Sequence, residues 1–231
     1  MTDFENPTLI LDSSGASGLV ALVQDTQVIQ RESTALFGQA GHLTAALVEL
    51  LAEANIGMQQ IHKVITGVGP GSFTGIRICM ATAQGLVAGL PKTSEAKLFG
   101  VDAFDLQYAS YKRLHTDVAA QAVLVLVESK RSELFAQSYD EQGDKHGHPF
   151  LLPKDQAPKV TESILTGDAL AGLQGVLEER HHHICVSPQD YICAHEKNLQ
   201  SDYEVALKPF YLRPPDLGPA KVLQPAKPTG L

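Results

Sequence analysis

The distribution of apolar residues along the chain predicts alternating strands and helices. Short runs rich in β-branched residues are typical of buried strands, whereas leucine and alanine at three- and four-residue spacing predict a helix with one buried stripe. Turn-forming residues separate the first three runs, which therefore predict a meander. In chain order, the elements expected in the first half are strands at 8–12, 18–24 and 27–33, a helix at 37–56, a strand at 64–66, a helix at 73–89, a strand at 97–101 and a helix at 102–113.

The second half of the chain starts with a similar order of predicted elements. An apolar strand at 122–127 is followed by a turn and a strand at 133–139, so the two halves predict a duplicated α/β architecture. The stretch 145–160 is polar and contains three prolines, and we interpret it as a long excursion. The remaining expected elements are strands at 162–165 and 182–186, helices at 169–179 and 190–199, an extended segment at 209–213 and a proline-rich tail.

The segment from Phe73 to Gly89 carries a single charge, Arg77, among seventeen residues. Ser72 or Thr74 is expected to cap this helix, because a hydroxyl there accepts a hydrogen bond from an unpaired backbone N–H. A helix that is apolar or small on nearly every side must be covered on nearly every side. We expect its surface to be shared between the protein core and a partner.

The helix expected at 37–56 has a second, milder apolar line formed by Ala45, Val48 and Ala52. This line indicates either a helix held between the sheet and a neighbouring element or a face that docks a partner. The pattern alone leaves both alternatives open.

A glycine-rich loop, Gly69-Pro70-Gly71-Ser72-Phe73-Thr74-Gly75, precedes the helix at 73–89. Backbone N–H groups at the start of a helix favour anions. However, the loop lacks the lysine of a P-loop, and Pro70 removes an N–H that a dinucleotide phosphate would need. The sequence therefore favours a structural turn, which lets strand and helix approach closely, over a phosphate cradle.

The turn Asp12-Ser13-Ser14 follows the first strand, and an acid in this place is the layout of a phosphate-binding hairpin in actin-like ATPases. Those hairpins usually have a glycine directly after the acid, so that the backbone can wrap the phosphate, whereas this chain has Ser13. We interpret the turn as a vestigial nucleotide-binding site.

Metal ligands with a recognisable spacing are absent from the sequence. The run His181-His182-His183 is expected to be a solvated loop, because adjacent residues of a strand point to opposite faces and rarely chelate together. Cys185, Cys193 and His195 form a loose trio without zinc spacing. The carboxylates are scattered, and none is paired for acid–base work.

Composition narrows the classes of function. A formal net charge of −8 gives no general attraction for nucleic acid, so a role near RNA would work through a basic partner. Three cysteines argue for reduced thiols and a cytoplasmic location. The acidic N-terminus is unlike a signal peptide, and no apolar run is long enough to predict a membrane span.

The segment Gly69–Arg77, followed by Ala83-Gln84-Gly85-Leu86, closely resembles the signature of the bacterial TsaB (YeaZ) family. The opening LILDSS, the pair His42-Leu43 and the C-terminal segment Tyr211-Leu212-Arg213-Pro214-Pro215 are also similar to that family. The resemblance covers residues 8–101 well and the rest in patches. The second domain departs from the family's D-A-R-R-G-E: it reads Glu128-Ser129-Lys130-Arg131-Ser132-Glu133.

The resemblance implies an α/β fold of two actin-like (ASKHA, ribonuclease H-like) subdomains, each a mixed sheet with flanking helices. The N-terminal subdomain, which would contain the partner-docking helices, is expected at 1–106, the C-terminal subdomain at 107–212 and the proline-rich tail at 213–231.

The resemblance also implies a function. The chain would be a non-catalytic scaffold that binds and activates TsaD, in the complex that transfers a threonylcarbamoyl group to the adenosine next to the tRNA anticodon. It would have no cofactor of its own, since ATP and a metal ion are expected on partner subunits, a TsaD-like transferase and a TsaE-like ATPase. It would contact tRNA only indirectly, would not bind membranes, and could self-pair through the docking helices when alone.

Two alternatives come from other functional classes. One is an actin-like ATPase or kinase that uses Asp12 and the Ser13-Ser14 turn. The other is a peptidase, which the missing histidine metal pair disfavours. No catalytic or metal-binding residue is expected in the scaffold. Its signature loop comprises Gly69, Pro70, Gly71, Ser72, Phe73, Thr74, Gly75 and Arg77, and its expected partner interface comprises His42, Ala45, Val48, Ala52, Ile76, Met80, Ala83 and Val87.

Overall fold

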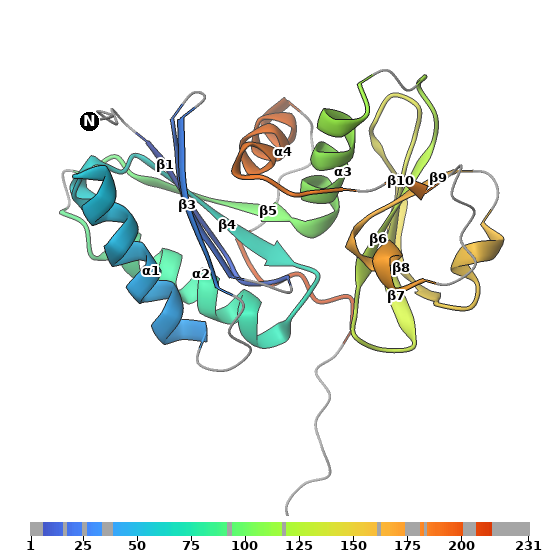
Figure 1. Cartoon of the computed structure of the whole chain (residues 1–231), viewed down its shortest axis with the longest axis horizontal. Coiled ribbons are helices and arrows are strands. Elements are labelled where there is room, and N and C mark those ends of the chain that lie inside the picture. The colour runs from blue at the N-terminus through green and yellow to red at the C-terminus, as the bar shows by residue number, and fades with distance from the viewer. Residues whose placement is uncertain are drawn as a thin grey trace, which may run out of the picture.

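The structure is a computed structural model of the whole chain, and it describes residues 7–15, 18–24, 27–33, 39–91, 94–116, 119–160, 163–173, 181–182, 184–200 and 207–213. Two five-stranded mixed sheets stand beside one another, and two helices lie between them (Figure 1). The tail beyond 213 falls outside the described residues.

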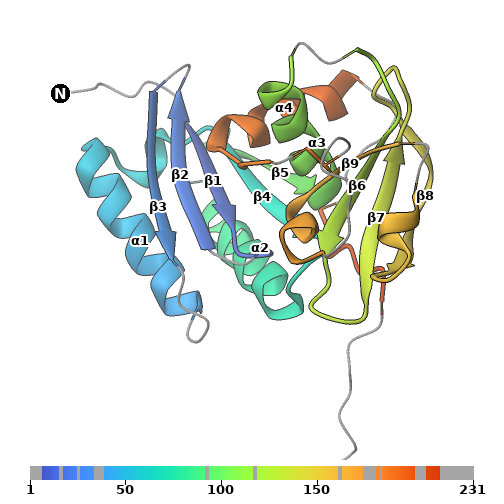
Figure 2. The same cartoon turned by 45° about the vertical axis from the view of Figure 1, so that its right-hand side comes forward.

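The first sheet has the strand order β3-β2-β1-β4-β5. β1 and β2 pair antiparallel, as do β2 and β3, whereas β4 and β5 continue parallel to β1. Figure 2 shows the three strands of the opening meander next to one another. Their bounds are those that the sequence pattern predicted. The strands are β1 (Thr8–Asp12), β2 (Gly18–Gln24), β3 (Gln27–Ser33), β4 (Lys63–Gly69) and β5 (Lys97–Asp102).

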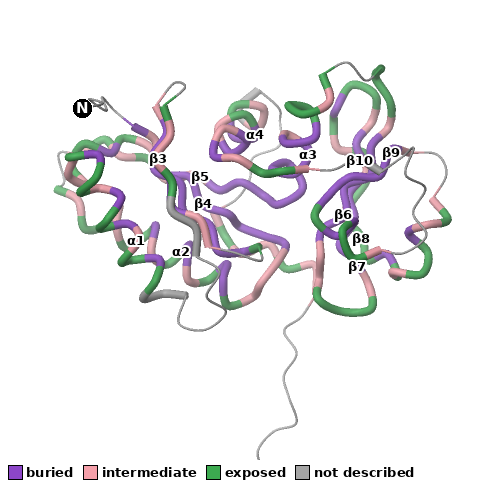
Figure 3. Tube along the Cα trace, in the orientation of Figure 1, coloured by how far each residue is buried: buried purple, intermediate pink, exposed green. Residues whose placement is uncertain are grey.

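The side chains of β1 alternate between the two faces of the first sheet. Leu9 and Leu11 belong to the core under helices α1 (Gln39–Ala54) and α2 (Phe73–Ala88). Ile10 belongs to a separate core with α4 (Pro188–Gln200). The sheet is therefore covered on both faces, and the interiors of its central strands are buried (Figure 3).

The second sheet repeats the topology of the first. Its order is β10-β9-β6-β7-β8, in which β6, β7 and β8 form an antiparallel meander and β9 and β10 continue parallel to β6. Matched strand by strand, this is the first sheet again, so the predicted duplication of an actin-like, ribonuclease H-like unit is confirmed. The strands are β6 (Val123–Glu128), β7 (Glu133–Tyr139), β8 (Lys145–Pro153), β9 (Ile164–Thr166) and β10 (His181–His182).

Helix α3 (Ala103–Leu114) joins the two units. Phe104 and Tyr108 pack into the core of the second sheet, whereas Leu106 packs with α4 against the first. The predicted boundary between residues 106 and 107 lies within this helix and stays a prediction. Short 3₁₀ helices complete the described elements: η1 (Met58–Gln60), η2 (Ala157–Lys159) and η3 (Asp168–Gly172).

The stretch 145–160 corrects the sequence prediction, because it contains strand β8 rather than only an excursion. β8 is an edge strand with one free side, and its pairing with β7 shifts register between Ala136 and Ser138. Pro149 lies between the paired residues His146 and Phe150, where a missing N–H costs no ladder bond. An edge position therefore tolerates prolines that would disrupt a central strand.

Two further predictions are corrected in the same half. The helix expected at 169–179 begins as the 3₁₀ helix η3, and residues 174–180 lie outside the described part. The His181–His183 run is not a solvated loop throughout: His181 and His182 form β10, and the ring of His182 packs edge-on to Tyr111 and His115. His183 lies outside the described residues.

None of the helices in the described part of the chain combines the length and the hydrophobicity that a bilayer-spanning segment requires. Cys79, Cys185 and Cys193 are all free thiols, as the sequence predicted. Burial raises the pKa of the Cys79 thiol to about 11, so it stays protonated at neutral pH.

The segment 207–213 ties the two sheets together. Phe210 donates its backbone N–H to the carbonyl of Val68 (2.8 Å), and its ring lies against the cores of both sheets. On the far side, Arg213 Nη1 donates to Glu133 Oε1 (2.7 Å). This strap therefore connects β4 to β7 across the gap between the sheets.

We expect Phe210→Ala to lower the free energy of unfolding by roughly 2 kcal/mol, below the value for a fully buried phenylalanine because Phe210 is only partly buried. Urea denaturation measures the change. The matched control is Tyr211→Phe, which removes one exposed hydrogen bond to Arg77 and should change stability by less than about 1 kcal/mol. Equal losses in the two variants would contradict a role of the strap in both cores.

A buried charge network holds α3 against the β7–β8 hairpin. Lys145 Nζ donates to Asp102 Oδ2 (2.5 Å) and Asp105 Oδ2 (2.8 Å), and Tyr139 Oη donates to Asp105 Oδ1 (2.8 Å). Asp102 also caps α3, since its Oδ1 accepts from two backbone N–H groups. Burial, and then the neighbouring charge of Asp105, raise the pKa of Asp102 to about 6, although Lys145 opposes the rise.

This network predicts a pH dependence of stability. Because the folded-state pKa of Asp102 lies above its ordinary value of 3.8, its contribution is fully present below pH 4 and is lost as the pH rises through 6. Asp102→Asn keeps the cap but cannot ionise. We therefore expect this variant to gain stability relative to the wild type between pH 4.5 and pH 7.5, measured by urea denaturation. A stability difference that is constant with pH, or that moves in the opposite direction, would contradict this assignment.

Candidate functional site

The carboxylate of Asp12, at the end of β1, is held inside the protein. Its Oδ1 accepts from the backbone N–H of Ser14 (2.7 Å), and its Oδ2 accepts from the hydroxyl of Tyr191 on α4 (2.8 Å). Asp12 is only 5% exposed, and its carboxylate lies so close to Gly67 that any Cβ there would clash. Both carboxylate oxygens therefore have protein partners.

The signature loop packs directly on the turn after β1. The backbone N–H of Ser72 donates to the carbonyl of Ser14 (2.7 Å), and Ser13 Oγ donates to the carbonyl of Gly75 (2.7 Å). A Cβ at Gly71 would lie 2.3 Å from Ser14 O, and one at Gly75 would lie 1.7 Å from Ser13 O. These glycines allow loop and turn to touch, as expected for a structural corner, and the contact covers the backbone that a phosphate would need.

The loop also sets the start of α2. Ser72, rather than Thr74, is the N-cap: its Oγ accepts from the backbone N–H of Gly75 (3.2 Å). One turn further on, the guanidinium of Arg77 lies 3.9 Å above the ring of Phe73, and its Nε donates to the hydroxyl of Tyr211 (2.9 Å). The first turn of α2 is thus attached to the C-terminal strap.

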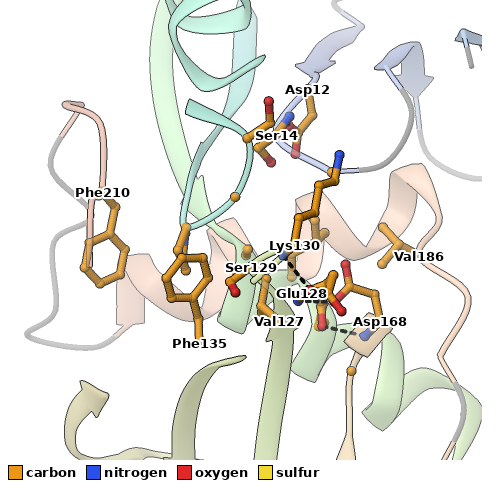
Figure 4. A pocket seen from close by; sticks show the side chains of 18 of the residues that line it. Asp12, Ser14, Val127, Glu128, Ser129, Lys130, Phe135, Asp168, Val186 and Phe210 are labelled. Atoms are coloured by element: carbon orange, nitrogen blue, oxygen red, sulfur yellow. Dashed lines mark hydrogen bonds between the residues drawn. The ribbon is translucent and has the colours of Figure 1, made fainter. Parts of the chain in front are cut away.

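A cavity of about 1220 Å³ opens between the two sheets, beside this corner. The first sheet contributes Asp12, Ser14 and the loop up to Arg77, and the second contributes the turn 127–131 with Phe135 and Asp168. Figure 4 shows Lys130 extending from that turn toward the side of the cavity where Ser14 and Asp12 lie. Sequence reasoning missed this cavity, because its walls come from segments far apart in the chain.

The predicted interface residues divide into two groups. On α1, His42, Ala45, Val48 and Ala52 face the solvent, and Val48 is 62% exposed. On α2 the prediction needs correction: Ile76, Met80 and Ala83 are at most 4% exposed and belong to the core against the sheet and α1, so a partner could not reach them, and Val87 is partly buried there.

The outer face of α2 instead combines small residues with the exposed polar side chains of Thr74, Arg77 and Gln84. Ala81, Gly85 and Ala88 are exposed, and a Cβ placed at Gly85 would meet nothing within 4 Å. Helices α1 and α2 lie side by side on one face of the first sheet (Figures 1 and 2). The small or apolar residues that each exposes are therefore close enough to form one surface. We call Ala45, Val48 and Ala52 together with Ala81, Gly85 and Ala88 the helix face.

Among the described residues, no group of three or more His, Cys, Asp and Glu side chains is arranged to hold a metal ion. The Cys185, Cys193 and His195 trio of the sequence therefore does not form a site in the described part of the chain. His195 is buried in α4 with its ring against Phe99. Burial lowers the pKa of this imidazole.

Comparison with known proteins agrees with this fold. The family model for TsaD, tRNA N6-adenosine threonylcarbamoyltransferase, matches residues 39–195. Over 90% of this chain and the whole of the other, the structure of YeaZ from Pseudomonas aeruginosa superimposes with a TM-score of 0.63 at 21% identity.

Two curated relatives are named tRNA threonylcarbamoyladenosine biosynthesis protein TsaB. The protein from Haemophilus influenzae is 34% identical over 86 residues, covering 37% of this chain and 36% of that one. The protein from Escherichia coli is 27% identical over 141 residues, covering 60% and 58%. The chain thus spans between about a third and three fifths of the length of these relatives.

The two sheets have the same topology, and the turn after β1 is covered by the signature loop; these features define an actin-like α/β protein. Its class is the one that the transferase model describes. Within that class, the chain belongs to the TsaB (YeaZ) family. The resemblance first drawn from the segment Gly69–Arg77 is confirmed.

Proposed function

We propose that this chain takes part in the synthesis of threonylcarbamoyladenosine in tRNA, as a non-catalytic subunit that binds a TsaD-type transferase through the helix face. The names of the TsaB relatives support the pathway. The proposed docking through the helix face rests on one observation: Val48, at the centre of α1, is exposed between the exposed residues Ala45 and Ala52. Small and apolar side chains in this arrangement let a partner helix approach closely.

A role without catalysis of its own agrees with the state of Asp12. In an actin-like ATPase this carboxylate would face the nucleotide, whereas here it is bonded to Ser14 and Tyr191 and covered by the signature loop. ATP, the metal ion and a TsaE-type ATPase are accordingly proposed to belong to the partner subunits. Self-pairing through the helix face and a cytoplasmic location remain parts of this proposal.

Reconstitution tests the proposal. The chain alone should neither hydrolyse ATP nor modify tRNA, and light scattering of its mixture with a TsaD-type transferase should give the mass of a complex. Threonylcarbamoyl transfer to tRNA should require that mixture together with a TsaE-type ATPase. ATP hydrolysis by the isolated chain that Asp12→Ala abolishes would overturn the proposal in favour of an actin-like ATPase.

A further inference from the structure

Strand β8 is an open edge with two exposed apolar side chains. It lies at the end of the second sheet (Figure 2), and no described strand pairs with its outer side. Phe150 is 42% exposed and Leu151 is 40% exposed. Because adjacent residues of a strand point to opposite faces, a helix or loop on one face could cover only one of them. An occupant that covers both must be a strand with two adjacent apolar residues of its own.

The backbone of β8 restricts which strands can pair with this edge. Lys154 donates its N–H to the carbonyl of Ser132 (2.9 Å), directly beyond the last pair of the β7–β8 ladder. Since hydrogen-bonded residues alternate along an antiparallel strand, Leu152 also faces β7, whereas Pro153 and Leu151 turn their backbone groups outward. These two residues therefore offer two carbonyls but only one N–H to an added strand, because proline has none.

This shortage of donors disfavours a second copy of β8 as the occupant. A second β8 would place its own Pro153 at the edge, and the carbonyl opposite each proline would be left without a donor. The occupant must instead bring N–H groups at alternate positions, together with its two adjacent apolar residues.

The C-terminal strap brings the rest of the chain to the end of β8. Arg213, the last described residue, pairs with Glu133 (2.7 Å), and Glu133 lies opposite Pro153 at the end of β8. A segment that starts at this end and runs along β8 must be antiparallel to it. Residues 214–219 span up to about 20 Å when extended, whereas the position next to β8 is only two strand spacings, about 10 Å, from β7. The length of the chain beyond Arg213 therefore suffices to reach the edge.

The sequence beyond Arg213 contains one segment that meets the requirements of the edge. Residues 220–224 are its longest stretch without proline, and Val222 and Leu223 are its one adjacent pair of large apolar residues. With Val222 opposite Leu151, Leu223 lies opposite Phe150, and each pair shares one face of the sheet. In this register the N–H groups of Val222 and Ala220 point at the carbonyls of Leu151 and Pro153, which are the acceptors that the edge offers.

We propose that residues 220–224 add to β8 as a sixth, antiparallel strand of the second sheet, with Val222 on Leu151 and Leu223 on Phe150. The added strand covers both exposed side chains and closes the edge against pairing with other chains. This interaction goes beyond the proposed function and does not depend on it, because β8 belongs to the second sheet, whereas the helix face lies on the first (Figure 1).

Limited digestion of the whole chain with trypsin tests the added strand. Trypsin cleaves after lysine and arginine but not before proline, so the bond between Lys221 and Val222 is the one tryptic site after Arg213. A paired strand must open before a protease can cut it. We therefore expect mass spectrometry to show that residues 222–231 are released at least tenfold more slowly than from a synthetic peptide of residues 214–231.

Two leucine variants of the segment beyond Arg213 make the test specific. Leu223→Ser removes the apolar contact with Phe150 and should raise the rate of cleavage to that of a peptide with the same change. The matched control is Leu217→Ser, which removes an apolar residue outside the proposed strand and should leave the protection unchanged. Leu151→Pro tests the other partner: it removes the outward N–H of β8 but no hydrogen bond to β7, so cleavage should accelerate while the melting temperature changes little.

The proposal fails if the whole chain is cut as fast as the peptide, or if Leu223→Ser accelerates cleavage no more than Leu217→Ser. Protection that disappears on dilution would also overturn it, because the segment would then lie on a second copy of the chain. All these variants should bind a TsaD-type transferase like the wild type, so failure of this proposal is distinguishable from failure of the helix-face proposal.

Discussion

Val48→Glu should leave the chain folded and weaken its binding to a TsaD-type transferase by about 100-fold or more. Val48 is 62% exposed, so a glutamate there remains solvated in the isolated chain, and unfolding by urea should change by less than about 0.5 kcal/mol. In the complex, the same carboxylate would be desolvated between helices without a partner, which costs several kcal/mol. Titration calorimetry gives the affinity, and denaturation of the same sample gives the stability.

The control for this variant is Leu151→Glu. Leu151 is a similarly sized apolar residue, 40% exposed, on the edge strand β8 of the other sheet. It should change neither binding nor transfer. Wild-type affinity in Val48→Glu would show that the transferase does not bind the helix face. An equal loss of affinity in both variants would indicate a general effect of the added negative charge.

The second large effect concerns two glycines of one helix. Gly75→Ala should destabilise the fold by about 2–5 kcal/mol, because the new Cβ would lie 1.7 Å from the backbone oxygen of Ser13, which is itself fixed in the turn after β1. Gly85→Ala in the same helix has open space at its Cβ and should stabilise by about 1 kcal/mol through helix propensity. Thermal unfolding separates the two, since opposite shifts of the melting temperature are expected.

This pair tests what the signature loop does. If the loop is a structural corner, the Gly75→Ala variant should lose folding stability. If the loop were a phosphate cradle, the variant would instead remain stable and lose a ligand. A stable Gly75→Ala variant would therefore contradict the corner interpretation. Gly85→Ala also adds a methyl group to the helix face, so stronger folding together with weaker partner binding would place Gly85 in the interface.

The regular elements were predictable because each rests on local chemistry. The bounds of β1, β2 and β3 follow from apolar runs ended by turn residues. Those of α2 follow from a hydroxyl cap, at Ser72 or Thr74, and from Pro91, which lies shortly after the helix and cannot continue it. Strand β8 was not predictable, because its prolines disfavour a strand unless the segment is known to lie at an edge. Edge position is a property of the whole sheet.

The candidate site was only partly predictable, for the same kind of reason. On α1 the line of Ala45, Val48 and Ala52 left a packed face and a docking face open, and the structure shows that these residues are exposed. On α2 an almost uncharged helix gives no periodic signal of its inner side. Ile76, Met80 and Ala83 were therefore predicted to belong to a face shared between the core and a partner, whereas the structure buries all three in the core. Likewise, no local pattern could pair Asp12 with Tyr191, which lies 179 residues away, or bring Lys130 and Arg77 to one cavity.

Hydrogen–deuterium exchange of the chain, alone and mixed with a TsaD-type transferase, tests the central claim most directly. We predict slower exchange over α1 (residues 39–54) and α2 (residues 73–88) in the mixture, with the second sheet and its edge strand β8 unchanged. Protection confined to the second sheet, or no protection of α1 in a mixture that forms a complex of the expected mass, would contradict the proposal that this chain acts by docking its helix face on the transferase.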